Sequence, residues 1–113
     1  MHELSLADEM VRLIESAALS QGFQRARVVR LEVGTLSCVE AEAMALAFEA
    51  ASLGTCAEGA ELVLLLVDAQ GACPACGHAQ TLQTLYDACE SCDHLPMRVL
   101  TGTQLRVRDL DVE

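Results

Sequence analysis

Two pairs of cysteines restrict the fold of this chain more than any other feature. The segments "CPACGH" and "CESCDH" each contain a C-x2-C pair, and twelve residues separate the pairs. Two cysteines three positions apart can direct both thiolates from one tight turn to the same ion, and two such turns complete the tetrahedron typical of Zn²⁺. Glycine after the first pair suits the tight turn. The spacing therefore predicts a structural zinc site made by Cys73, Cys76, Cys89 and Cys92.

The alternative interpretation is a pair of redox-active or disulfide-bonded C-x2-C motifs, and the zinc content of the protein separates the two. Four thiolates would leave no open position for a bound water, so this zinc would be structural and not catalytic. The two other cysteines, Cys38 and Cys56, are predicted to be small buried side chains.

Two histidines flank the predicted zinc site. His78 and His94 each follow the second cysteine of a pair by two residues. One interpretation places them at the surface or behind the ligands, where they support the site. The other is that an imidazole replaces a thiolate under changed conditions, since imidazole is also a zinc ligand.

The segment 69–97 differs in composition from the rest of the chain. It contains four of the six cysteines, two of the three histidines and both prolines, but no arginine or lysine. A segment of this size has little core, so a bound metal would supply much of its folding free energy. We therefore predict a zinc-ribbon-like domain at 69–97, inserted into a larger domain formed by 1–68 and 98–113.

The larger domain shows the pattern of two helices and three strands. Ser5 as N-cap predicts a helix from about Leu6 to Gln21, and the apolar spacing predicts a second one over about Glu40–Leu53. The stretches "RVVRLEV" and "TQLRVRDL" alternate like strands with one buried face, whereas the apolar run "AELVLLLVD" predicts a central strand covered on both faces. The expected fold class is α+β, a small two-layer domain of two helices on a three-stranded sheet.

Charge and composition argue against several classes of function. The chain has 17 acidic residues against 7 arginines, for a net charge of −10. Nucleic-acid binding depends on Lys and Arg that neutralise phosphates, and an anionic membrane would repel such a chain. No run approaches the ~20 apolar residues of a membrane span, and no signal peptide is recognisable, so we expect a cytoplasmic protein. Because the sequence contains no nucleophile motif and no phosphate-binding loop, we do not expect an enzyme.

The N-terminus offers a second metal site. His2 follows the first residue directly, and its imidazole and its own backbone amide can close a chelate ring on an ion. Glu3 or the free α-amine would add donors, and such nitrogen-rich sets suit Ni²⁺ or Cu²⁺ better than Zn²⁺. The alternative is an exposed histidine at a frayed chain end.

Several stretches together resemble one known family. They are the start "MHELSLA", the middle "RLEVGTLSCVEAEAMALAFEAA", the two C-x2-C pairs before a final strand, and the segments "GTCAEGAEL" and "TGTQLRVRDL". The chain resembles, over nearly its whole length, the HypA/HybF family of metallochaperones that help to load nickel into [NiFe]-hydrogenase.

The resemblance implies roles for individual residues. His2 would be the essential nickel ligand, Glu3 would lie at the nickel site and contribute to binding or docking, and Glu40 would lie close by. The four cysteines would hold the zinc, and the family fold is a two-layer α+β nickel domain with an inserted zinc domain.

The resemblance also implies a function. The protein would be a nickel metallochaperone that binds Ni(II) at its N-terminus as transient cargo and delivers it to the [NiFe]-hydrogenase large-subunit precursor, with Zn(II) as a structural or regulatory ion. Its partners would be that precursor and a nickel GTPase of the HypB type, and a homodimer stays open. The alternative is a structural zinc-ribbon module for protein interaction, without nickel transfer.

Overall fold

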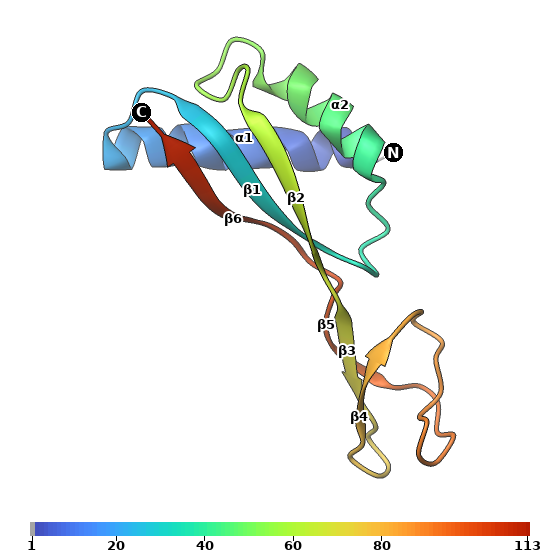
Figure 1. Ribbon diagram of the computed structural model, residues 1–113. Helices are drawn as coiled ribbons and strands as arrows, with labels where there is room; N and C mark the ends of the chain where they lie inside the picture. Colours follow the sequence, from blue (N-terminus) through green and yellow to red (C-terminus); the bar gives the residue numbers. More distant parts are fainter. Residues whose placement is uncertain (1) are drawn as a thin grey trace. The chain divides into compact units, whose positions relative to one another are not determined.

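The computed structural model of this chain describes residues 2–113, which form two helices and six strands. In chain order the elements are α1 Glu3–Gln21, β1 Ala26–Gly34, α2 Ala41–Ser52, β2 Glu61–Val67, β3 Ala69–Ala72, β4 Ala79–Leu82, β5 Arg98–Thr101 and β6 Leu105–Val112 (Figure 1). Among the described residues, neither helix is long and apolar enough to cross a membrane.

The chain divides into two compact units. The first comprises the chain up to Leu31, Val39–Leu65 and Arg106–Glu113, and the second comprises Glu32–Cys38 and Leu66–Leu105. The second unit thus includes the four-cysteine segment 69–97 together with residues on both sides of it and the end of β1.

The first unit contains a three-stranded sheet in the order β2-β1-β6. The start of β1 lies beside the end of β6, because the Arg25 carbonyl accepts the Glu113 N–H at 2.9 Å, so these two strands are antiparallel. The Ala26 N–H bonds the Cys56 carbonyl ahead of β2, and the Thr35 N–H bonds the Val67 carbonyl at its end, so β1 and β2 are parallel with α2 as the crossover. The predicted fold class, two helices on a three-stranded sheet, is confirmed.

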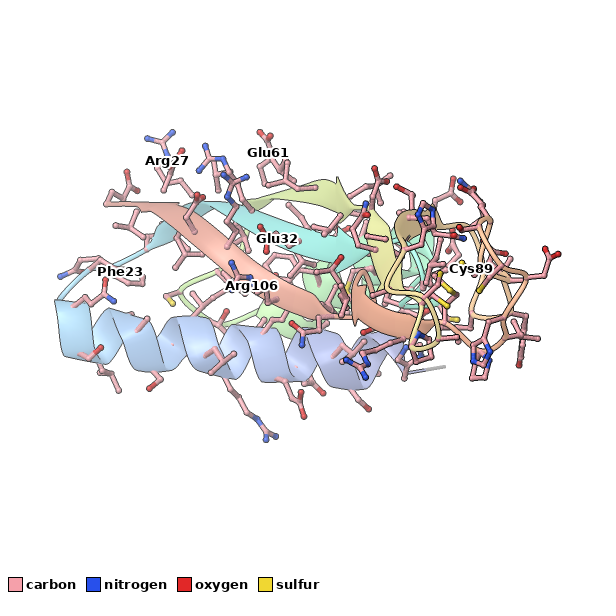
Figure 2. The ribbon with its side chains drawn as sticks, turned by 90° about the horizontal axis from the view of Figure 1, so that it is seen from below. Phe23, Arg27, Glu32, Glu61, Cys89 and Arg106 are labelled. Carbon is pink, nitrogen blue, oxygen red and sulfur yellow. The ribbon has the colours of Figure 1, made fainter. Side chains whose placement is uncertain are left out.

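One face of this sheet packs on the helices and the other carries charge. The core is aliphatic apart from one phenylalanine, and its fully buried members include Ala7, Ile14, Val29, Leu31, Met44 and Phe48. On the opposite face, Arg30 on β1 bonds Asp109 at 2.9 Å and Asp111 at 3.0 Å on β6. In Figure 2, Arg27 and Glu61 likewise lie on the side of the sheet away from α1. The alternation seen in the sequence therefore separates the core from a charged outer surface.

Two predictions about these elements are wrong. Helix α1 begins at Glu3 and not near Leu6, because the first backbone bond of the helix already runs from the Leu6 N–H to the carbonyl of His2, the N-cap residue, so Ser5 lies inside the helix. Strand β2 lies at the edge of the sheet, and β1 occupies the centre. Most of the apolar run in β2 is only half-buried, so continuous hydrophobicity did not distinguish an edge strand from a central one.

The second unit is built on a smaller sheet in the order β4-β3-β5. Strand β3 pairs antiparallel with β4, Ala69 opposite Leu82, and antiparallel with β5, Gly71 opposite Val99. The buried apolar cluster of this unit is small: Ala69, Cys73, Leu82, Cys89 and Met97. Two of its five members are cysteines of the C-x2-C pairs, so the packing of this unit depends directly on the cysteine site.

Two glycines allow backbones to meet closely inside the second unit. The Gly34 N–H bonds the Gln104 carbonyl at 2.9 Å, and the Leu36 N–H bonds the Gly102 carbonyl at 2.8 Å. A Cβ added to Gly34 would collide with the backbone carbonyl group of Gly102. Gly102 has a φ of 96°, and a Cβ there would collide with Ala69. Neither position has room for a side chain.

Replacing Gly34 with alanine should therefore destabilise the protein strongly. We expect Gly34→Ala to lower the free energy of unfolding by at least ~2 kcal/mol, because backbone atoms must move to admit the methyl group. Gly22→Ala is the matched control, since its φ is 77° but nothing lies within 4 Å of the added Cβ. That variant should cost only about 1 kcal/mol. Equal losses in urea unfolding would contradict the close approach.

Candidate metal centres

The four cysteine sulfurs predicted to bind metal converge on one point. All four lie within 4.8 Å of one another, and the sulfurs of Cys73 and Cys92 and of Cys76 and Cys89 are each 3.6 Å apart. Figure 2 shows these sulfur atoms in yellow beside Cys89. A tetrahedron with metal–sulfur bonds of about 2.3 Å has sulfurs about 3.8 Å apart, so this donor set fits a thiolate-bound ion such as Zn²⁺.

The two C-x2-C turns share one backbone pattern. The N–H of the first cysteine bonds the carbonyl of the residue five positions on, Cys73 to His78 at 2.8 Å and Cys89 to His94 at 2.9 Å. Backbone N–H groups within the first turn also point at its first sulfur, such as that of Ala75 at 3.3 Å from Cys73. Each turn is therefore closed by its own backbone and aims its sulfurs inward before any ion is considered.

The residue after the second cysteine closes each turn in the left-handed conformation. Its φ is 81° at Gly77 and 61° at Asp93, and its N–H bonds the carbonyl of the first cysteine at 2.9 and 2.8 Å. Glycine adopts this conformation freely, and aspartate tolerates it better than most residues. The tight turn predicted at Gly77 is thus present, and the second turn repeats it without glycine.

The pKa values of two of these cysteines are shifted in opposite directions. Burial opposes ionisation of Cys73, but the N–H groups of Cys76 and Ala75 aimed at its sulfur outweigh burial and lower its pKa to about 6. At Cys92 the His94 N–H favours the thiolate, yet the neighbouring cysteine sulfurs outweigh it and raise the pKa to about 12. Four thiolates can share this space only when a cation offsets their repulsion.

Gln80, which the sequence analysis did not identify, ties the second turn to the sheet. This buried residue of β4 uses both ends of its amide: Nε2 donates to the Ala88 carbonyl at 3.1 Å, and Oε1 accepts the Glu90 N–H at 2.9 Å. These two bonds flank Cys89 on both sides. Gln80 therefore fixes the position of one cysteine relative to the strands that carry the other turn.

The imidazoles of His78 and His94 are not part of the cluster formed by the four cysteine sulfurs. The converging donor atoms are the four sulfurs, and His78 and His94 contribute backbone carbonyls to the turns. The His78 Nε2 lies 3.9 Å from the Glu90 carboxylate. A role of either imidazole in exchange with a thiolate stays a prediction.

His2 and Glu3 lie at the start of α1, and Glu3 also contacts the residue that precedes α2. His2 is exposed and occupies the N-cap position of α1, where its carbonyl accepts the Leu6 N–H at 3.0 Å. Glu3 is buried, and its carboxylate accepts the Glu40 N–H at 3.3 Å. The Glu3 side chain therefore links the first turn of α1 to the start of α2.

Both glutamates of this region are engaged by backbone N–H groups. The Glu3 N–H and then the Glu40 N–H favour the charged carboxylate and lower the pKa of Glu3 to about 2. Glu40 is the N-cap of α2, and its carboxylate accepts the N–H groups of Glu42 at 3.2 Å and Ala43 at 2.7 Å. Negative charge at a helix N-terminus interacts favourably with the helix dipole.

The structure brings Glu3 and Glu40 together, but it does not form a three-side-chain metal cluster with His2. Among residues 2–113, the cysteine site is the group of three or more side chains close enough to hold an ion. The α-amine predicted as a further donor belongs to Met1 and lies outside the described residues. An ion at His2 would thus depend on the imidazole and on donors other than a cluster of side chains.

The prediction for Cys38 is wrong. Its side chain is exposed, because the residue has a φ of 63° in the loop before α2 and its sulfur faces the Leu36 carbonyl at 3.8 Å. Cys56 is half-buried, and burial, followed by the nearby Glu15 carboxylate, raises its pKa.

The fold and the cysteine site define an α+β protein with a four-cysteine cluster close enough to hold a metal ion. Comparison with known proteins makes this specific: the profile of the HypA family, described as "Hydrogenase/urease nickel incorporation, metallochaperone", matches residues 1–112. The chain belongs to the HypA family.

Two relatives match this chain along its full length. The chain is 39% identical over 113 residues to "Hydrogenase maturation factor HypA" of Azotobacter chroococcum mcd 1 and 38% identical to that of Azotobacter vinelandii, with 100% of each chain covered. The solution structure of the Ni metallochaperone HypA from Helicobacter pylori shares the fold, with a TM-score of 0.76, 23% identity, and coverage of 99% of this chain and 97% of the other.

Removing the Gln80 amide should weaken metal binding by the cysteines. We expect Gln80→Ala to lower zinc affinity ~10–100-fold, because the second turn loses the bonds that hold it. Gln70→Ala removes an amide of β3 whose Nε2 donates to the Thr81 hydroxyl at 3.0 Å, and it should leave the affinity unchanged. Competition with a chromophoric zinc chelator measures both. Equal affinities of the two variants would contradict a positioning role for Gln80.

Two substitutions of Glu3 should distinguish the contribution of its hydrogen bonds to stability from that of its negative charge. Glu3→Gln keeps a carbonyl oxygen that accepts N–H groups, whereas Glu3→Ala leaves the Glu40 N–H without this acceptor. Thermal unfolding followed by helix circular dichroism should therefore show a lower Tm for Glu3→Ala than for Glu3→Gln. Glu9→Ala, on the exposed side of α1, should match the unmodified protein. The link between the helices would be refuted by two Glu3 variants of equal stability.

Proposed function

We propose that this chain is a nickel carrier for hydrogenase maturation. It binds Ni²⁺ at its N-terminus through His2 and delivers the ion to the [NiFe]-hydrogenase large-subunit precursor. The observation that carries the proposal is the exposed imidazole at the first turn of α1, in a chain of the HypA family. The four cysteines hold a zinc ion as a resident structural component.

The surroundings of His2 support binding of a cation. A helix N-terminus carries partial positive charge, which disfavours a nearby cation. Glu3 directly follows His2, and Glu40 is bonded to Glu3, so two carboxylates offset that charge. Because both carboxylates already accept backbone N–H groups, we assign them to positioning and charge compensation, and we assign the imidazole of His2 to ligation.

Zn²⁺ and Ni²⁺ prefer different donor atoms, and the cysteine cluster and the N-terminus offer these two kinds of donor. Four thiolates form a closed donor set that holds Zn²⁺ firmly and leaves no position for a substrate. A few nitrogen and oxygen donors at an exposed helix start suit Ni²⁺ and leave room for a competing ligand from another protein. The zinc unit therefore serves folding and docking, whereas the N-terminus exchanges its ion.

Delivery requires partners. The large-subunit precursor receives the nickel, and a nickel GTPase of the HypB type works with the carrier and supplies nucleotide hydrolysis. The alternative function is a zinc-ribbon module for protein interaction without nickel transfer, and metal binding by the N-terminus distinguishes the two.

A nickel titration tests the proposal. We expect isothermal calorimetry of zinc-loaded protein with its native N-terminus to show one Ni²⁺ bound per chain. His2→Ala should weaken this binding at least ~100-fold, more than the loss of a supporting group costs, because it removes the side-chain ligand. Zinc content should stay at one ion per chain in both proteins.

The control is His78→Ala, which removes a histidine next to the cysteine site. It should bind nickel like the unmodified protein, because His78 lies in the other unit of the chain. Equal nickel binding by the His2→Ala variant and the unmodified protein would refute the nickel site and leave the interaction module as the function.

A further inference from the structure

A short loop of the second unit exposes two apolar side chains. Between β4 and Cys89 the chain leaves the sheet in a loop, 83–88 (Figure 1). Tyr86 in this loop is 83% exposed, and Leu85 beside it is 47% exposed. Tyr86 is the one tyrosine of the chain and one of its three aromatic residues. An aromatic side chain so exposed adds little to folding, which suggests that it serves a contact with another molecule.

Hydrogen bonds hold this loop in one conformation. The Asp87 carboxylate accepts the Gln83 N–H at 2.7 Å and the Thr84 hydroxyl at 2.8 Å. The Thr84 hydroxyl oxygen in turn accepts the Tyr86 N–H at 3.1 Å. These bonds, with the Gln83 N–H first, also lower the pKa of Asp87, because they favour its charged carboxylate.

The far end of the loop is fixed as well, because the Ala88 carbonyl accepts the Gln80 amide at 3.1 Å. A loop already in its bound shape loses little conformational entropy on binding. Leu85 and Tyr86 are therefore presented outward by a pre-organised support, as rigid aromatic anchors are at protein interfaces.

The charge around the loop restricts what it can contact. Segment 69–97 has no lysine or arginine, and its three acidic residues, Asp87, Glu90 and Asp93, all lie within seven positions of Tyr86 in the sequence. Glu90 and Asp93 are exposed. Nucleic acid and anionic lipid would be repelled, and a second copy of this chain also carries a net charge of −10. The surface fits a protein with an apolar pocket bordered by lysine or arginine.

We propose that loop 83–88 is a docking loop, in which Tyr86 and Leu85 enter an apolar pocket bordered by basic residues on the protein that receives the nickel. This inference rests on the proposed function, which names that protein as the hydrogenase large-subunit precursor. The receiving protein is the occupant because an ion held by few donors passes directly only within a docked complex.

The test measures binding of the full, zinc-loaded chain to the purified large-subunit precursor by biolayer interferometry. Tyr86→Ala should raise Kd at least ~10-fold, as expected for a buried aromatic anchor. Tyr86→Phe keeps the ring and should stay within ~3-fold of the unmodified chain. Leu100→Ala is the matched control, since this residue of β5 is 56% exposed in the same unit but outside the loop, and its Kd should not change.

Salt dependence tests the charge argument separately. Raising sodium chloride from about 0.05 M to about 0.5 M should weaken binding of the unmodified chain, because salt screens the attraction between acidic loop and basic pocket border. Each Tyr86 variant should keep one zinc per chain, which shows that the unit is folded.

The outcomes separate this inference from the nickel function. An equal Kd for Tyr86→Ala and the unmodified chain, or no measurable binding of the precursor, overturns the docking loop. Tyr86-dependent binding of a single-stranded oligonucleotide would overturn it in favour of base stacking. Nickel titration of the same proteins is independent of these binding results. Tyr86→Ala should bind one Ni²⁺ per chain. Absence of nickel binding by both the unmodified chain and this variant would count against the proposed function alone.

Discussion

The convergence of four cysteine sulfurs is the constraint on which the second unit depends. The sulfurs lie within 4.8 Å of one another, and Cys73 and Cys89 also make up two of the five residues in the buried cluster. The same side chains thus provide the core and the ligands. Without a cation their thiolates repel one another, and little other apolar burial compensates. We therefore expect metal binding and folding of this unit to be coupled, with the Gln80 amide holding the second turn in position.

The proposed nickel site at the N-terminus has the opposite properties. His2 is exposed at a helix start, and the adjacent carboxylates serve the backbone of two helices. Few donors and open access make an ion easy to exchange, whereas the cysteine site is closed by its sulfurs. A carrier needs both properties, because its fold must persist while its cargo leaves. The Glu3 bond to the start of α2 gives the exposed end a fixed position without closing it.

The sequence was sufficient wherever one local pattern determined the structure. The spacing of the cysteines, the bounds of α2 and the alternation in β1 and β6 all appear in the structure as expected. The sequence was insufficient where the position or the contacts of a residue depend on segments that are distant along the chain. The continuous apolar run of β2 did not reveal its place at the sheet edge, and the bond between the Glu3 carboxylate and the Glu40 N–H joins residues distant in sequence. Gln80 had no signal at all, because its role exists only once β4 lies beside the second turn.

The central claim is that two chemically distinct metal sites coexist in one small chain, with nitrogen and oxygen donors for the cargo and sulfur donors for the resident ion. X-ray absorption at the nickel and zinc edges, on protein loaded with one equivalent of each metal, tests it most directly. The account predicts a nickel spectrum with imidazole scattering and no sulfur neighbour, and a zinc spectrum with four sulfurs at about 2.3 Å. Sulfur scattering at the nickel edge would place the cargo among the cysteines and contradict the account.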